Sequence, residues 1–253
     1  MARAAVPGRL NWLVATLVGT RDETATARTL VLDVPGWPGH LAGQHVDVRL
    51  TAEDGYSTQR SYSIASAASF GGSDGTRLEL TVQRIDDGEV SPYLTDTLAP
   101  GDPLELRGPI GGWFAWRPES TAPLLLLAGG SGIVPLMSII RTHDEAQSKR
   151  QVPVRLIYSV RSPADAIYAS ELNERTASSR LTVTSLYTRA APKGARAGRI
   201  NAGILADLAW PPDDKPATFV CGPSGFVETV ASLLVDAGHD PETIKTERFG
   251  PTS

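Results

Sequence analysis

The chain has 253 residues, of which 41% are hydrophobic and 21% charged, and its formal net charge is −4 at pH 7. This length allows two modest domains with separate cores, and the composition is that of an ordinary soluble protein rather than a disordered or fibrous one. The acidic balance offers no electrostatic footprint for a nucleic-acid backbone. The apolar run LLLLAGG at 124–130 is far shorter than a membrane span, so we expect no membrane insertion.

The N-terminal segment MARAAVPGRLNWLVATLV has only a short, interrupted apolar stretch, so we predict a first strand there rather than a signal peptide. The single cysteine, Cys221, excludes an internal disulfide and any all-cysteine iron–sulfur or zinc site within the chain. This cysteine usage predicts a reducing, cytoplasmic setting, and no metal site is expected.

Short strand-like runs separated by Gly, Pro and Asp dominate the first 116 or so residues. Their even spacing predicts a small antiparallel barrel or sandwich. Only EVSPYLTDTL, at 89–98, has the pattern of a short helix. The strand-like runs are NWLVATLVGT (11–20), RTLVLDV (28–34), HVDVRL (45–50), RSYSIAS (60–66), RLELTVQR (77–84) and PLELRGP (103–109).

After WRPESTAP (116–123), strands alternate with helical segments. Near-continuous apolar strands followed by amphipathic helices predict a parallel sheet covered on both faces. We therefore predict two domains, residues 1–117 and 118–253. The predicted strands are 124–129, 154–160, 181–188, 218–222 and 243–249, and the predicted helices are 134–147, 167–177 and 224–238.

Two turns in the second half have the chemistry of ligand sites. AGGSGIVP (128–135) follows an apolar strand and opens a helix, so a phosphate could approach its backbone N–H groups closely. A tight turn that uses glycine for geometry alone remains the alternative. In TFVCGPSGF (218–226), the sharp turn after Cys221 predicts that the sulfur faces a cleft, whereas the alternative is a small buried hydrophobe.

The run RSYSIAS concentrates polar groups on one predicted strand. By strand alternation, Arg60 and Tyr62 share one face while Ser61 and Ser63 share the other. An arginine can grip a pyrophosphate with its planar fork, and a tyrosine ring can lie flat against a flavin or a base. A surface strand with a solvated arginine is the alternative.

In this order, RSYS (60–63), GEVS (88–91), AGGSGIVP and CGP (221–223) resemble the ferredoxin–NADP⁺ reductase family of flavoproteins. The resemblance runs from about residue 10 to Phe249, and the ordered set is far more specific than any one motif. It implies a six-stranded antiparallel β-barrel that holds FAD and a five-stranded parallel α/β domain that holds a nicotinamide nucleotide.

The resemblance also implies roles for residues of the barrel half. Arg60 would clamp the FAD pyrophosphate, Tyr62 would support the flavin ring, and the Ser63 hydroxyl would lie beside the hydride-accepting nitrogen. The remaining FAD contacts would come from the rest of these motifs and from the strand passing the adenosine part: Ser61, Val82, Gln83, Gly88, Glu89, Val90 and Ser91. The family often has a lysine where Gln83 stands.

In the second half, the resemblance implies a nucleotide-binding site and catalytic residues beside it. Phe249 would cover the flavin face that the nicotinamide reaches, Glu247 would belong to its polar surround, and Cys221 would lie beside the nicotinamide; with Ser63 these form the predicted catalytic set. A core residue of the last strand is the alternative for Phe249, which Gly250–Ser253 follow. The nucleotide contacts would be Gly130, Ser131, Gly132, Val160, Arg161, Cys221, Gly222, Pro223 and Phe249.

SLYTRAAPKGARAGRI (185–200) bears on which nucleotide is used. Thr188 and Arg189 occupy the family position that holds the 2′-phosphate of NADP, Arg196 and Arg199 are close in sequence, and the segment has no acidic residue for a free ribose hydroxyl. We therefore expect NADPH to be preferred over NADH.

The chemistry that the resemblance implies is hydride transfer from the nicotinamide to FAD, followed by release of electrons to an acceptor. Nothing in the chain resembles a second redox centre, so a separate acceptor protein is expected: a ferredoxin, or a haem or metal-centred oxidoreductase. Two alternatives remain open. One is a diffusible flavin or quinone reductase, and the other is a flavoprotein subunit that conducts electrons within a complex without turnover of its own.

Overall fold

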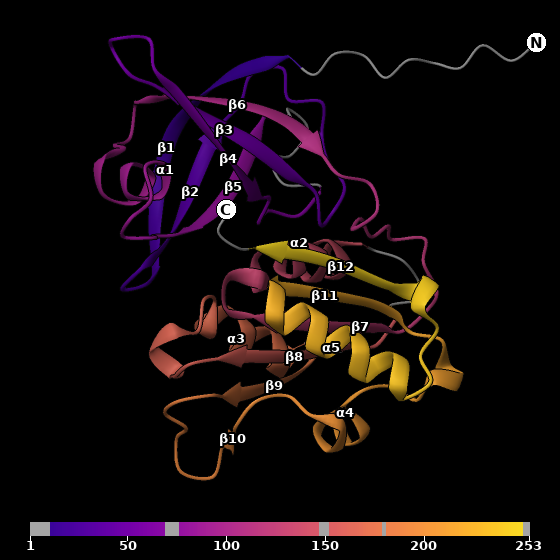
Figure 1. Cartoon of the computed structure of the whole chain (residues 1–253). Helices are drawn as coiled ribbons and strands as arrows, with labels where there is room; N and C mark the ends of the chain where they lie inside the picture. Colours follow the sequence, from indigo (N-terminus) through magenta and orange to yellow (C-terminus); the bar gives the residue numbers. More distant parts are fainter. Residues whose placement is uncertain (1–10, 69–75, 147–151, 179–180, 250–253) are drawn as a thin grey trace, which may run out of the picture.

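The computed structural model describes residues 11–68, 76–146, 152–178 and 181–249. Two six-stranded sheets follow one another along the chain, and the N-terminal antiparallel sheet lies above the C-terminal parallel one in Figure 1. Both predicted architectures are therefore confirmed. The first strand of the chain, β1 (Trp12–Thr24), lies where we predicted it.

The antiparallel sheet closes into a barrel. Its strand order is β4-β3-β6-β1-β2-β5, and an isolated bridge between Ile64 and Leu80 joins the two outermost strands. Closure removes the exposed edges that an open sheet would leave. The other strands are β2 (Ala27–Asp33), β3 (His45–Thr51), β4 (Ser57–Ser63), β5 (Arg77–Gln83) and β6 (Pro103–Ile110).

Strand alternation separates the two faces of β5. Leu78, Leu80 and Val82 are buried in the barrel core, whereas Glu79 and Thr81 are buried on the opposite face. The predicted short helix is present as α1 (Val90–Pro92) and the π-helical turn η2 (Tyr93–Thr97), which covers the barrel with apolar side chains such as Leu94.

The parallel sheet has the order β10-β9-β8-β7-β11-β12. The five predicted strands are present, and a two-residue strand, β10 (Arg196–Ala197), extends one edge. The first strand, β7, lies in the middle of the sheet. Strands β8, β9 and β10 are added on one side of it and β11 and β12 on the other, so the strand order switches at β7. The five are β7 (Leu124–Gly129), β8 (Val154–Val160), β9 (Leu181–Tyr187), β11 (Ala217–Pro223) and β12 (Ile244–Phe249).

Helices cover both faces of this sheet. Side chains of α2 (Ile133–Glu145) and α3 (Ala169–Ser178) share one apolar cluster with the sheet, and those of α4 (Ala202–Leu208) and α5 (Ser224–Asp236) share another. We did not predict α4, which is only seven residues long. Its signal was present in Asn201, whose side chain accepts the N–H of Ile204 as an N-cap.

The cluster beneath α2 and α3 extends to the barrel half, because it includes Ala42, Ala65, Phe114 and Trp116. The predicted division after residue 117 falls between β6 and β7, and its placement stays a prediction. No helix in the described ranges is long and apolar enough to cross a membrane.

Candidate functional site

A cleft of about 450 Å³ opens at the carboxyl ends of the parallel strands, where open α/β sheets bind ligands. Barrel residue Gln83 and β12 residue Phe249 also line it, so the cleft lies where the two sheets meet. Its other lining residues are Gly129, Gly130, Ser131, Ser159, Val160, Arg161, Asp165, Thr188, Arg199, Ile200, Pro223, Gly225, Phe226 and Thr229.

Two helix N-termini reach this cleft. Helix α2 follows the 3₁₀ turn η3 (Gly130–Gly132), and α5 follows Pro223; neither helix has a side-chain cap. The first N–H groups of a helix lack intrahelical acceptors and carry partial positive charge, which suits a phosphate group. The glycine-rich turn and the CGP turn, which are predicted nucleotide contacts, thus lie at one site.

The cleft is also basic on its β8–β9 side. Arg161 and Arg199 line it together with Thr188, whose N–H donates to the Val160 carbonyl at 2.8 Å. Arg189, the predicted 2′-phosphate contact, is exposed and lies outside the set of lining residues. Arg161, Thr188 and Arg199 therefore line the cleft, whereas Arg189 and Arg196 do not; Arg196 is paired with Asp207 instead.

On the barrel, Arg60 and Tyr62 lie on β4 as predicted. The Arg60 guanidinium is exposed and donates to the Gln59 carbonyl at 2.7 Å, so a ligand can replace the water around it. Tyr62 packs against the barrel core, and burial raises the pKa of its phenol to about 12. Ser61 donates to Asp47 at 2.7 Å, which engages its hydroxyl within the barrel wall.

The GEVS turn lies near Arg60. The Ser91 hydroxyl accepts the N–H of Ile85 at 3.0 Å, which holds the turn before α1, and it keeps its own proton for donation. A hollow of about 490 Å³ is lined by Glu89 and by Thr58, whose hydroxyl lies 3.4 Å from the Arg60 guanidinium. Glu89 of the GEVS turn therefore lines the hollow directly, whereas Arg60 approaches it only through Thr58. Val82 and Val90 are buried in the barrel core, and Gly88 lies close to the Ser91 hydroxyl, since a Cβ at Gly88 would be 3.1 Å from Ser91 Oγ.

Ser63, His45 and Glu247 meet where the barrel contacts β12. Ser63 is paired with His45 across β4 and β3, and His45 Nδ1 lies 3.6 Å from Glu247 Oε1. Ser63 Oγ and Glu247 Oε2 are both buried and have no hydrogen-bond partner within the described part of the chain. Buried polar atoms of this kind normally have partners, so a polar ligand is expected beside them.

Burial sets the protonation states at this junction. It raises the pKa of Glu247 to about 7 and lowers that of His45, although the Asp47 carboxylate opposes the latter effect. His45 is therefore neutral at pH 7, and its approach to Glu247 is not a charge pair there. We did not predict His45 as a site residue. Its signal in the sequence was the alternation of HVDVRL, which puts His45 and Asp47 on the outer face of the barrel.

The prediction that the Cys221 sulfur faces the cleft rather than the core is wrong. Cys221 is fully buried in the apolar cluster beneath α2, and the cleft is lined instead by Pro223, two residues later. Alternation along β11 turns the Cys221 side chain inward, next to Glu247 on the paired strand. Burial, with the Glu247 carboxylate, raises the pKa of the thiol well above its ordinary value.

Phe249 lies at the end of β12, partly buried against the same cluster, and lines the cleft beside Pro223, its partner on β11. It is thus both a core contact and a cleft wall. Gly250–Ser253 lie outside the described residues. Phe226 and Thr229, on the first two turns of α5, are lining residues that the sequence analysis missed, because only the helix geometry brings them to the cleft.

The polar groups at this site fit the two groups that we expect to bind there, a flavin and a nucleotide pyrophosphate. Ser63 Oγ and Glu247 Oε2 are orphaned polar atoms that a flavin edge would partner, and the uncapped helix N-termini fit a pyrophosphate. The structure brings Ser63, Glu247 and Phe249 to one junction, with Cys221 buried behind it.

Both halves of the chain match known domain families. Residues 16–114 match the oxidoreductase FAD-binding domain, and residues 126–232 match the oxidoreductase NAD-binding domain. Two curated relatives are bacterial. The glycine betaine monooxygenase reductase subunit of Pseudomonas aeruginosa is 33% identical over 216 residues, and the NADH oxidoreductase HCR of Escherichia coli is 35% identical over 212 residues. Each match covers 83% of this chain but only 56% and 60% of the respective relative.

Solved structures agree in fold. The flavohem-like FAD/NAD-binding domain of nitric oxide dioxygenase from Vibrio cholerae aligns with a TM-score of 0.82 at 26% identity, covering 94% of this chain and 99% of that one. The cytochrome P450 reductase GcoB of Amycolatopsis also aligns at 0.82, with 27% identity and coverage of 96% and 71%.

Proposed function

Because this chain belongs to the ferredoxin–NADP⁺ reductase family of FAD- and NAD-binding oxidoreductases, we propose that it oxidises NAD(P)H and delivers the electrons through FAD to a separate acceptor protein. The observation that carries the proposal is on β12: Phe249 lines the cleft, and Glu247, two residues earlier, lies beside His45 and thus next to Ser63 of the barrel. There a nicotinamide in the cleft and a flavin on the barrel would meet face to face.

Bound FAD supplies the capacity to take a hydride and to release electrons. The protein supplies position. Arg60 and the GEVS turn would hold the FAD pyrophosphate, Tyr62 would support the ring, and the Ser63 hydroxyl would donate to the flavin edge. Gly130, Ser131 and Gly132 would hold the nucleotide pyrophosphate at the start of α2, with Val160 and Arg161 flanking it.

Phe249 would cover the flavin face that the nicotinamide reaches, and the Glu247 carboxyl group would hold or release a proton near neutral pH because its pKa is about 7. Cys221 acts from behind the junction, as a buried neutral thiol that packs beneath it. Together these side chains would exclude water from the place where the nicotinamide and flavin rings meet.

The separate acceptor is supported by the reductase subunits and components among the relatives, such as the ferredoxin reductase component of a 3-ketosteroid monooxygenase of Rhodococcus rhodochrous. One cysteine cannot ligate an iron–sulfur cluster, so the described part of the chain provides no cysteine-ligated second centre. We also propose NADPH as the preferred donor, because Thr188 and the arginines beside it suit a 2′-phosphate, and a cytoplasmic location, where a free thiol persists.

The purified protein tests the proposal. We expect a yellow protein with bound FAD, whose visible absorbance is bleached by NADPH in the absence of oxygen. A colourless protein that takes up no added flavin would contradict it. Turnover with ferredoxins, cytochrome c, quinones and free FMN as acceptors then separates a protein acceptor from a diffusible one.

A further inference from the structure

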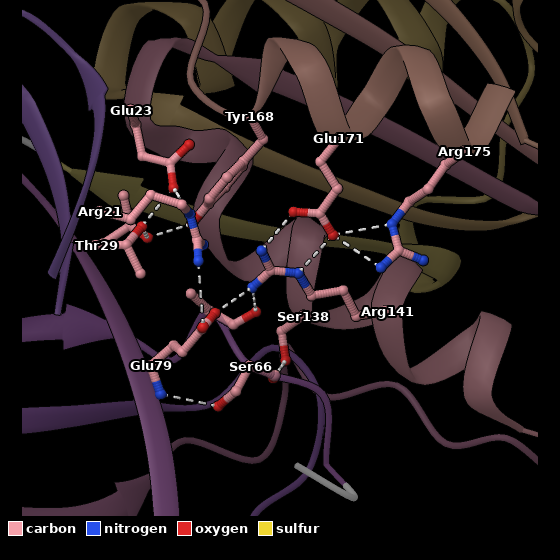
Figure 2. Close-up of polar contacts among 12 residues, drawn as sticks. Arg21, Glu23, Thr29, Ser66, Glu79, Ser138, Arg141, Tyr168, Glu171 and Arg175 are labelled. Carbon is pink, nitrogen blue, oxygen red and sulfur yellow. Dashed lines mark hydrogen bonds and ion pairs between the residues drawn. The ribbon is translucent and has the colours of Figure 1, made fainter. Parts of the chain in front are cut away.

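A buried set of polar contacts joins the barrel to the parallel sheet beside the cleft (Figure 2). Its centre is Arg141 on α2, which is 7% exposed. The Arg141 guanidinium donates to the Ala65 carbonyl and to Glu79 of β5, each at 2.8 Å. Its other side donates to Glu171 of α3 at 2.9 and 2.6 Å. One side chain therefore ties two barrel segments to two helices of the other half.

A second arm of the network runs through hydroxyl groups. Tyr168 is buried just before α3, and its hydroxyl donates to Thr81 on β5. Thr81 in turn is 2.7 Å from Thr29, whose hydroxyl donates to Glu23 at 2.7 Å. Each hydroxyl has one proton, so the hydrogen bonds all run in the same direction, from Tyr168 to the Glu23 carboxylate. The Tyr168 ring lies 5.0 Å from the Arg141 guanidinium, so the two arms are in contact.

The backbone at Tyr168 is held in an uncommon conformation. Its φ is 61°, a left-handed value that few residues other than glycine adopt. Such a conformation persists when surrounding contacts determine it, and here the phenol is fixed between Thr81 and Arg141.

The same two segments that carry this network also form walls of the cleft. On β5, Glu79 and Thr81 contact the network and Gln83, two residues further on the same face, lines the cleft. On the other side, the segment 161–168 carries Arg161 and Asp165 in the cleft wall and Tyr168 in the network. A shift at the network would therefore move both walls of the cleft.

We propose that Arg141 and Tyr168 are positioning residues for nucleotide oxidation, which hold β5 of the barrel against the segment 161–168 so that the bound nucleotide lies at the right distance from the flavin. The inference rests on the proposed function. Neither residue lines the cleft; both act through Gln83 and through Arg161 and Asp165. Hydrogen bonds and ion pairs restrict direction and distance more narrowly than apolar contacts do, and transfer between two rings depends steeply on their separation.

Tyr168→Phe and Thr81→Val test the hydroxyl arm with little loss of volume. We expect each variant to bind FAD, to be reduced by NADPH on the order of ten-fold more slowly, and to show a raised KM for NADPH. The double variant should be no slower than Thr81→Val alone, because Thr81→Val already removes the Tyr168 contact together with the Thr29 contact of the same hydroxyl. Amide hydrogen exchange in the flavin-loaded protein should be faster at 79–83 and 161–168.

Arg155→Gln is the matched control. Arg155 is a half-buried arginine whose guanidinium, like that of Arg141, lies over an aromatic ring, that of Trp210 at 3.7 Å. It donates to the carbonyls of Leu208 and Ala209, so these partners all belong to the parallel-sheet half. We expect this control to lower the melting temperature without changing the reduction rate or KM. Arg141→Gln should show both effects.

Two results would overturn the inference alone: network variants that melt earlier but reduce flavin at the wild-type rate and KM, or additive effects of Thr81→Val and Tyr168→Phe. If NAD(P)H does not reduce the bound flavin of the wild-type protein, the proposed function itself is overturned, and this inference with it.

Discussion

At the scale of single residues, the site combines groups whose charge depends on burial. Glu247 has a pKa of about 7 with one oxygen unpartnered, and the Cys221 thiol beside it is held neutral. Arg161 and Arg199, which line the cleft, are exposed. The site therefore combines a junction where burial favours the neutral forms of Glu247 and Cys221 with exposed arginines along the cleft, as a neutral ring and a phosphate tail on one ligand would require.

Glu247 makes stability depend on pH. Its pKa in the folded protein, about 7, exceeds the ordinary 4.5, so the folded state binds the proton more tightly. The wild type should therefore lose stability as the pH rises from about 4.5 to 7, by up to about 3 kcal/mol. Glu247→Gln should lack this loss. Urea unfolding of the flavin-free proteins at pH 5 and 8 measures it, with exposed Glu228→Gln as the control. Equal pH dependence in wild type and Glu247→Gln would contradict the assignment.

Arg189 and Arg199 compete for the role of 2′-phosphate contact. We expect Arg189→Gln to raise the KM for NADPH by roughly ten- to 150-fold and to leave that for NADH unchanged, because a charged hydrogen bond contributes about 1.5–3 kcal/mol. Arg199→Gln is the comparison, since Arg199 lines the cleft. A selective loss at Arg199 alone would move the phosphate site to that residue, and equal losses with both nucleotides would exclude a phosphate contact.

At the scale of elements, the site depends on close packing between the ends of the parallel strands and the first turns of the helices that follow them. The turn between β7 and α2 lies directly against β11: a Cβ on Gly132 would be 2.1 Å from the Cys221 carbonyl oxygen. This close packing brings the N-terminus of α2 beside that of α5. A side chain at this position would push apart the two turns that line the cleft.

Gly132→Ala should therefore destabilise the protein by about 1–3 kcal/mol and weaken nucleotide binding, because backbone atoms must move to admit the methyl group. Gly225→Ala is the matched control, since Gly225 also lines the cleft and a Cβ there meets nothing within 4 Å. Denaturant unfolding and titration with NADP⁺ measure both effects. Gly132→Ala with wild-type stability would contradict the close approach.

At the scale of the whole molecule, one apolar cluster crosses from the barrel to the parallel sheet. Phe114, between β6 and β7, packs edge-on to Phe219 of β11 at 5.3 Å, and Lys245 of β12 donates to the Ala115 carbonyl at 2.9 Å. The two halves are therefore joined by a buried apolar contact as well as by the polar network around Arg141. Both must persist for the cleft to keep its shape.

Phe114→Ala should lower the free energy of unfolding by about 3–5 kcal/mol, through lost burial and the cavity left behind. Its neighbour Trp113 is 61% exposed, so Trp113→Ala should change the unfolding free energy by no more than about 0.5 kcal/mol. Unfolding followed by circular dichroism gives both values. Similar losses for the two variants would mean that Phe114 does not join the halves.

Sequence alone determined the two architectures, the order of the strands along the chain and the position of each motif on them. Alternation in RLELTVQR, apolar runs such as LLLLAG and the glycine turn after it are local properties, because strand period and turn geometry depend on residues a few positions apart. Only the tertiary structure decided that His45 lies beside Glu247 and Ser63, that Cys221 turns into the core, and that Arg141 bonds Ala65 and Glu79. Those contacts join residues tens to hundreds of positions apart, and their partners are chosen by how the two sheets pack rather than by any local pattern.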